Sequence, residues 1–206
     1  MKTLSRNPLR NSIPAIPFLT IIAILPHPAF GHPGHGLLTF YAALIHPITG
    51  LDHLLTALAV GVWAAGPKEI QARNPSWRGP LGFLIGILGG ALAGQVGMVL
   101  PFCEQGILLS LLLLGLCLAL NSRSNIWPAT GMLFCFGAFH GNAHGLEVAQ
   151  GASGGLAILG FLVSTGILHG MGIAGVTAVR KRFKEQQALL ILRWAGVGLM
   201  GSVFFL

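Results

Sequence analysis

Apolar stretches long enough to cross a lipid bilayer follow one another through most of this chain. A transmembrane helix needs about 20 predominantly apolar residues. Only 8% of the 206 residues carry charged side chains, against about 25% in soluble domains. The sequence therefore predicts an all-α fold, a polytopic membrane helical bundle of about six transmembrane helices. The predicted spans are 48–65, 80–100, 105–120, 127–146, 154–178 and 188–206, with a half-helix over 37–45 before the first.

The first 31 residues have the three parts of a secretory signal peptide. Basic residues come first, an apolar segment covers 13–25, and small residues stand at 29 and 31, at the positions that a signal peptidase recognises. We therefore expect a signal peptide at 1–31 and a six-span transmembrane domain at 32–206. Two prolines in the apolar segment weaken its helix, so an uncleaved anchor is the alternative.

Basic side chains alternate between successive loops of the predicted bundle. The loops after the first, third and fifth spans carry Lys or Arg, whereas the loops after the second and fourth spans carry neither. Because basic loops stay on the cytoplasmic side, the mature N-terminus and the C-terminus are both predicted to be extracytoplasmic. These loops hold most of the basic residues behind the net charge of +7. We therefore expect the lipid bilayer as a partner and no nucleic acid.

Five of the eight histidines and the single aspartate lie in or beside the apolar stretches. They gather in two segments, His-Pro-Ile-Thr-Gly-Leu-Asp-His at 46–53 and Phe-His-Gly-Asn-Ala-His-Gly-Leu-Glu at 139–147, with His169 on its own. Ionisable groups at membrane depth are costly, and they usually mark an ion path, a proton relay or a metal site. The predicted topology puts both segments in the outer leaflet, so we expect them to share one depth.

In the second segment, His140, His144 and Glu147 follow the spacing i, i+4, i+7 and so share one face of a helix. Imidazole together with carboxylate is a ligand set for divalent first-row transition metals. Three such groups are too costly in hydrocarbon to serve packing alone. We therefore interpret this stripe as one side of a metal site.

In the first segment, His46 and His53 are seven residues apart. On a regular helix they share a face but lie about 10 Å apart along the axis. One ion can bridge them only if the helix breaks, and Pro47 and Gly50 favour a break or a helix start between them. Asp52 points elsewhere on a regular helix. It is either a ligand at a neighbouring site or an acceptor that fixes a histidine tautomer.

His169 is open to two interpretations, a metal ligand or an interhelical hydrogen-bonding residue. Asn142 and Gln95 are expected to be hydrogen-bond partners and not ligands. The candidate metal ligands are His46, Asp52, His53, His140, His144, Glu147 and His169.

Glycines recur at every fourth residue along two of the predicted spans, over 82–94 and 137–145. Gly166 and Gly170 flank His169. Small residues at this spacing let helix backbones approach closely. The pattern therefore predicts tight helix packing around the histidines.

The patterns H-x5-D-H at 46–53 and F-H-G-x-A-H-G-x-E at 139–147 resemble the motifs of the HupE/UreJ family of nickel/cobalt permeases. The resemblance covers nearly all of the mature chain. It implies secondary uptake of Ni(II), with Co(II) as the alternative, across the inner (cytoplasmic) membrane of a bacterium. It implies no enzymatic activity and no prosthetic group, because the metal ion is the cargo. It also implies an indirect link to hydrogenase or urease maturation.

The same resemblance assigns residues to the metal site by position. The histidines and acids of the two motifs match the family's motif residues, and His169 falls where the family often has a histidine. After Asp52 and His53 this chain has Leu-Leu-Thr-Ala in place of the family's usual Leu-Leu-Ala-Met. A thioether ligand from that position is therefore absent from the sequence.

Two other classes of function compete with a permease. The segment Gly151–Gly154 resembles the serine motif of rhomboid proteases, with Ser153 as the nucleophile and His169 as a conceivable base. The other class is a sensor or assembly subunit that binds the ion without moving it. The sequence offers no soluble signalling domain for such a role.

Overall fold

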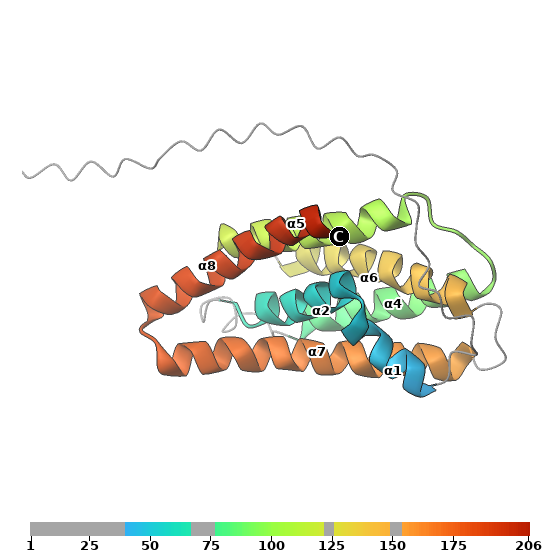
Figure 1. The fold of residues 1–206 in the computed structure, drawn as a ribbon, viewed down its shortest axis with the longest axis horizontal. Helices are drawn as coiled ribbons and strands as arrows, with labels where there is room; N and C mark the ends of the chain where they lie inside the picture. The colour runs from blue at the N-terminus through green and yellow to red at the C-terminus, as the bar shows by residue number, and fades with distance from the viewer. Residues whose placement is uncertain (1–39, 67–76, 122–125, 149–153) are drawn as a thin grey trace, which may run out of the picture. The chain divides into compact units, whose positions relative to one another are not determined.

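The computed structural model describes residues 40–66, 77–121, 126–148 and 154–206, all within one compact unit, Gly34–Leu206 (Figure 1). Within these ranges every regular element is a helix, and the all-α helical membrane bundle is confirmed. The predicted signal peptide lies outside the described residues. The helices are α1 (Phe40–Thr49), α2 (Leu51–Ala64), α4 (Arg78–Gln95), α5 (Cys103–Ala119), α6 (Ile126–Val148), α7 (Gly154–Arg182) and α8 (Glu185–Ser202), followed by the short 3-10 helix η1 (Val203–Phe205).

The helices agree with the predicted spans to within a few residues, except at the end of α4. That helix stops at Gln95 and not near residue 100, because the chain turns at Gly97, whose φ is +82°. By length and composition, α7 and the continuous helix α8–η1 can each cross a membrane alone. The bent pair α1–α2 makes a third span if it is counted as one. The number of six spans therefore stays a prediction.

The first predicted span is broken where the sequence favoured a break. Helices α1 and α2 meet at Gly50 at an angle of 82°. Gly50 has an extended backbone (φ −83°, ψ 112°), although its N–H still donates to the carbonyl of His46. A Cβ at this position would lie only 3.2 Å from Oδ1 of Asp52 and 3.3 Å from Nδ1 of His53. The absence of a Cβ at Gly50 therefore leaves space for the side chains of Asp52 and His53.

Helices α4 and α6 pack with their backbones in close approach. A Cβ at Gly86 would overlap the carbonyl oxygen of Phe134, and a Cβ at Gly141 would overlap that of Ile87. The glycines on each helix therefore leave room for backbone carbonyl groups of the other helix. The spacing of every fourth residue predicted this close packing. This contact fixes the face of α6 that carries the histidines.

Helices α2 and α7 approach each other in the same way, but the glycines differ from those predicted. A Cβ at Gly61 would overlap the carbonyl oxygen of His169, and a Cβ at Gly172 would overlap that of Leu58. Gly170, in contrast, has no atom within 4 Å of its Cβ position, and Gly166 has only a side-chain atom at 4.0 Å. Residues three apart share a helix face whereas adjacent residues do not, so Gly172 lies on the same side of α7 as His169.

Basic side chains gather at one end of the bundle. The guanidinium of Arg180 donates to the carbonyls of Ala65 (2.8 Å) and Gly66 (2.7 Å) just after α2. The guanidinium of Arg78 lies 5.1 Å from the ring centre of Trp127, at the start of α6. This end is about 20 Å from Gly50, which is the length of the 14-residue helix α2.

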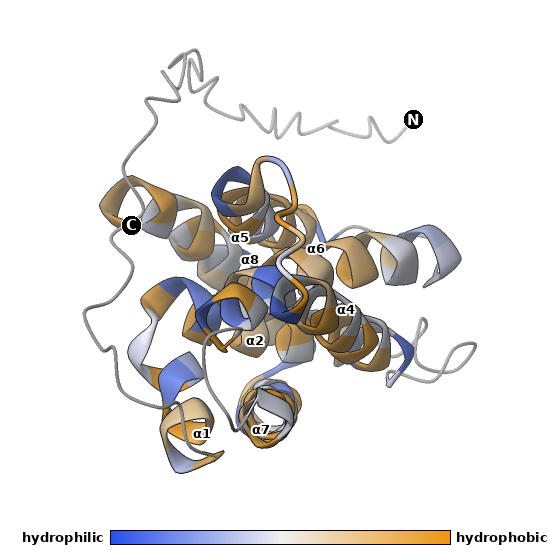
Figure 2. Cartoon of the chain, turned by 90° about the vertical axis from the view of Figure 1, so that its right-hand side faces the viewer, coloured by the Kyte–Doolittle hydropathy of each residue, from blue (hydrophilic) through white to orange (hydrophobic). Residues whose placement is uncertain are grey.

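The helices are coloured mainly as hydrophobic, and hydrophilic colour is confined to short stretches (Figure 2). Large apolar side chains such as Ile85, Ile167, Met171, Trp194 and Val197 are exposed. The buried polar side chains include three histidines, His140, His144 and His169. Apolar side chains on the surface, with a few polar groups inside a mainly apolar core, are typical of a bundle that faces lipid.

Two glycines of α4 provide a matched test of the close packing. Gly86→Ala should lower the free energy of unfolding by about 1–3 kcal/mol, because the added methyl overlaps a backbone carbonyl of α6. Gly89→Ala, one turn away, has open space and should leave stability unchanged or raise it by up to about 1 kcal/mol through helix propensity. Unfolding of the detergent-purified variants measures both effects. Equal stability of the two variants would contradict the packing described here.

Candidate metal site

The break at Gly50 brings the first histidine segment against α6. The imidazole of His144 has its ring centre 5.0 Å from that of His46 and 4.4 Å from that of His53. The ring centre of His53 is also 4.7 Å from that of His140. Four imidazoles from α1, α2 and α6 therefore form one continuous cluster, although almost ninety residues separate the two segments in sequence.

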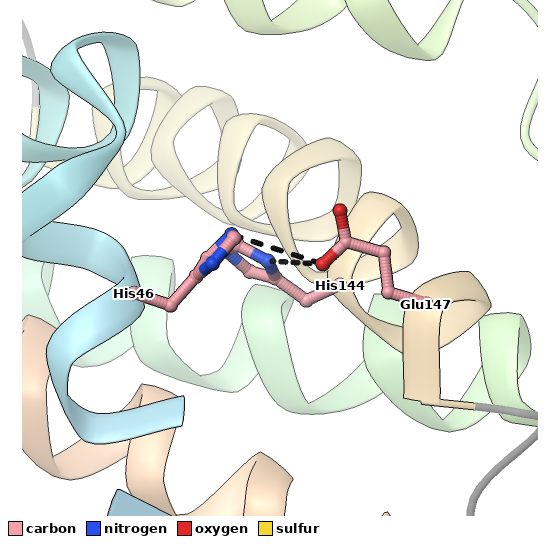
Figure 3. A group of neighbouring side chains, drawn as sticks. All are labelled: His46, His144 and Glu147. Carbon is pink, nitrogen blue, oxygen red and sulfur yellow. Dashed lines mark ion pairs between the residues drawn. The ribbon is translucent and has the colours of Figure 1, made fainter. Parts of the chain in front are cut away.

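At one end of this cluster, His46, His144 and Glu147 each aim a donor atom at the same small volume (Figure 3). Oε2 of Glu147 lies 3.7 Å from Nε2 of His46 and 3.8 Å from Nδ1 of His144. One ligand atom from each residue lies within 4.8 Å of the others. Ligands that each lie about 2.1 Å from a common ion are separated by at most about twice that distance. The three side chains can therefore hold one divalent cation with little movement.

His144 is the most enclosed member of the group. Its side chain is 4% exposed, and its ring stacks on Phe161 with ring centres 4.1 Å apart. Among the described residues, its Nδ1 has no hydrogen-bond partner. A buried polar atom without a partner costs free energy, which makes this nitrogen a candidate ligand atom. Glu147, with 37% of its side chain exposed, lies nearest to solvent or headgroups.

Asp52 acts on His53 and not on the group around Glu147. Its Oδ1 accepts hydrogen bonds from the backbone N–H of His53 (2.8 Å) and from the ring Nδ1 of His53 (2.8 Å). The ring is therefore held as the Nδ1–H tautomer. Its Nε2 is buried and has no partner among the described residues. Of the two roles that the sequence left open for Asp52, the geometry favours the acceptor that fixes a tautomer.

His140 lies at the inner end of the cluster. Its Nε2 is 3.1 Å from Oγ of Ser110 on α5, and its ring centre is 5.5 Å from that of Phe83 on α4. His140 is 2% exposed and Ser110 is fully buried. This end of the cluster is therefore closed by α4 and α5.

His169 on α7 is separate from the cluster. Its Nδ1 is 2.7 Å from the carbonyl oxygen of Ala57 on α2, so the ring donates a hydrogen bond between the two helices. The ring of Phe83 contacts both histidines, because its centre is 5.4 Å from that of His169 and 5.5 Å from that of His140. The Nε2 of His169 is buried without a partner among the described residues. The interhelical hydrogen bond of the second interpretation is therefore present, and the other ring nitrogen has no hydrogen-bond partner among the described residues.

Asn142 is a hydrogen-bond partner, as the sequence predicted. Its Oδ1 accepts from the backbone N–H of Leu100 (2.9 Å), and its Nδ2 donates to the carbonyls of Met98 (2.8 Å) and Gly90 (3.3 Å). These bonds satisfy the backbone of the irregular segment that follows α4. They also tie α6 to α4 and the segment after it, at a position between His140 and His144.

Two neighbours of the cluster were not identified from the sequence. Phe161 stacks on His144 and carries no signal, because a phenylalanine in an apolar span is ordinary. Ser110 does carry a weak signal, since it is a lone hydroxyl within a run of leucines. Ser153, the nucleophile of the alternative hydrolase, lies outside the described residues.

Comparisons with known proteins agree with the motifs. The family described as HupE / UreJ protein matches residues 20–206 of this chain. Protein HupE of Rhizobium leguminosarum bv. viciae is 35% identical over 165 residues, which cover 78% of this chain and 83% of that protein. No solved structure matches this chain.

A pair of acidic side chains tests the metal site. Glu147→Gln should weaken binding of Ni(II) to the purified protein by at least about tenfold, because an amide oxygen is a neutral and weaker donor than a carboxylate. Glu104→Gln removes an exposed carboxylate in the first turn of α5 and should leave binding unchanged. Equilibrium dialysis with nickel measures both. Unaltered binding in Glu147→Gln would remove this residue from the site.

Proposed function

This chain belongs to the HupE/UreJ family, and we propose on that premise that it takes up divalent transition-metal ions. The proposed cargo is Ni(II), with Co(II) as the alternative, and the proposed barrier is the bacterial cytoplasmic membrane. The ion is a substrate and not a resident cofactor. The cells that use it are those that mature a hydrogenase or a urease, as the family resemblance implies.

One observation supports this proposal most strongly. Donor atoms of His46, His144 and Glu147, which come from two helices far apart in sequence, lie within 4.8 Å of one another inside an apolar bundle. Nitrogen and carboxylate oxygen are ligands that suit first-row divalent ions. Packing alone gives no reason to gather such groups where their desolvation is so costly.

The proposed path begins at Glu147, the most exposed of the donors. A hydrated ion exchanges waters for the donors of His46, His144 and Glu147, and then passes inward to His53 and His140. Asp52 keeps the ring of His53 in the tautomer that offers Nε2 to the ion. Successive ligand groups avoid a single tight trap, because conduction requires release as well as binding.

His169 is the proposed inner station. It shares the neighbour Phe83 with His140 of the cluster, and its Nε2 is the nitrogen not used in the bond to Ala57. The basic end of the bundle, near Arg180, lies toward the cytoplasm in this proposal, following the positive-inside rule. The histidine cluster then faces the extracytoplasmic side, and the ion moves from the acidic mouth toward the basic end.

Uptake of radiolabelled nickel by cells that express the chain tests the proposal. We expect uptake above that of empty cells, and competition by excess cobalt that is stronger than competition by zinc. His140→Ala should reduce uptake to the background level, because it removes a donor from the middle of the path. Ser153→Ala should leave uptake unchanged, since a permease needs no serine nucleophile there.

The outcome separates the competing classes of function. Uptake that survives in His140→Ala but is lost in Ser153→Ala would contradict the permease and favour the serine hydrolase. Tight nickel binding without any uptake would favour a sensor or assembly subunit.

A further inference from the structure

Ser110 on α5 lies behind the histidine cluster, where the motifs assign no residue. It is fully buried and has three polar neighbours within hydrogen-bonding distance. Its Oγ is 2.6 Å from the carbonyl oxygen of Ile107, 3.1 Å from Nε2 of His140 and 3.4 Å from Oγ1 of Thr56. The roles of these atoms can be worked out from the number of hydrogens that each one carries.

A serine hydroxyl has one hydrogen to donate and two lone pairs that accept. The backbone carbonyl of Ile107 can only accept, and at 2.6 Å it takes the serine's hydrogen. Toward its other neighbours Ser110 is therefore an acceptor. The ring of His140 must then donate from Nε2, and the hydroxyl of Thr56 donates into the remaining lone pair.

This arrangement decides the tautomer of His140. A neutral imidazole carries one N–H and one lone pair. With the hydrogen on Nε2, the lone pair is on Nδ1, which is the nitrogen left to bind a metal. We propose that Ser110 is a positioning residue, which holds the His140 ring as its Nε2–H tautomer so that Nδ1 ligates the ion. The proposal rests on the metal uptake proposed above.

The same arrangement occurs at two other histidines of the bundle. Oδ1 of Asp52 accepts from Nδ1 of His53, and the carbonyl of Ala57 accepts from Nδ1 of His169. In both cases the opposite nitrogen is buried without a partner among the described residues. Ser110 therefore does for His140, with a hydroxyl, what a carboxylate and a backbone carbonyl do for the other two. Such outer acceptors orient the ring and raise the basicity of the ligand nitrogen.

Nickel binding to the detergent-purified protein gives the first test. Ser110→Ala removes the acceptor and should weaken binding by about 10–100-fold, the usual effect of losing such a partner. Ser110→Thr keeps a hydroxyl and should restore most of the affinity. Thr56→Val is the matched control, because it deletes a fully buried hydroxyl from the same group while leaving the contact between Ser110 and His140. It should bind nickel as the unaltered protein does.

Nitrogen-15 NMR of the metal-free, histidine-labelled protein gives the second test. The two ring nitrogens have distinct shifts according to which one carries hydrogen, and the signals of His140 are those lost in His140→Gln. We expect hydrogen on Nε2 of His140 in the unaltered protein and a mixture of tautomers in Ser110→Ala. A change in packing alone would not move this signature. Thermal unfolding of each variant shows whether it is folded.

The possible results are distinguishable. Hydrogen on Nδ1 of His140 in the unaltered protein would overturn the proposal even if Ser110→Ala fails to fold. Equal nickel affinity of folded Ser110→Ala and the unaltered protein would overturn the role of Ser110 and leave metal uptake standing. A protein that binds no nickel at all, under conditions where it is folded, would overturn both.

Discussion

The arrangement of the site depends on the interruption of one helix. On a straight helix, His46 and His53 would lie about 10 Å apart along the axis, too far to act on one ion. The bend of 82° at Gly50 instead brings the ring centres of His46 and His53 to 5.0 Å and 4.4 Å from that of His144. Glycine is needed at the bend, because a Cβ there would crowd Asp52 and His53. The residue that turns the chain therefore also makes room for the pair that orients one ligand.

The rest of the bundle holds the opposite face in place. Helix α6 carries the second set of donors, and its glycines receive backbone carbonyls of α4 so closely that neither helix can rotate without overlap. Such packing resists the movement that would let buried imidazoles reach water. In each of His53, His140 and His169, one ring nitrogen has a hydrogen-bond partner. The partners are Asp52, Ser110 and the carbonyl of Ala57, respectively. The Nε2 atoms of His53 and His169 are buried without a partner among the described residues, and in the metal uptake proposed above they serve as donors to the ion.

Much of this could be predicted from the sequence, because it follows from regular periods. The helical period alone places His140, His144 and Glu147 on one face, and the break near Gly50 follows from the residues between the two histidines. The angle of the break could not be predicted, since it depends on tertiary contacts such as that of α1 with α7, where a Cβ at Gly160 would lie 2.7 Å from the carbonyl oxygen of Phe40. The partnership of Ser110 with His140 was missed for a similar reason. A single serine forms no periodic pattern in the sequence, and only the tertiary fold shows which histidine ring lies next to it.

X-ray absorption at the nickel edge reports which atoms bind the ion and so tests whether the two helices share it. We expect nitrogen and oxygen as the only atoms bound to nickel, with imidazole contributions that fall in both His46→Ala and His144→Ala. This result requires that donors from α1 and α6 bind the same ion. A sulfur atom bound to nickel, or a spectrum that neither substitution changes, would rule out a site shared by these two histidines.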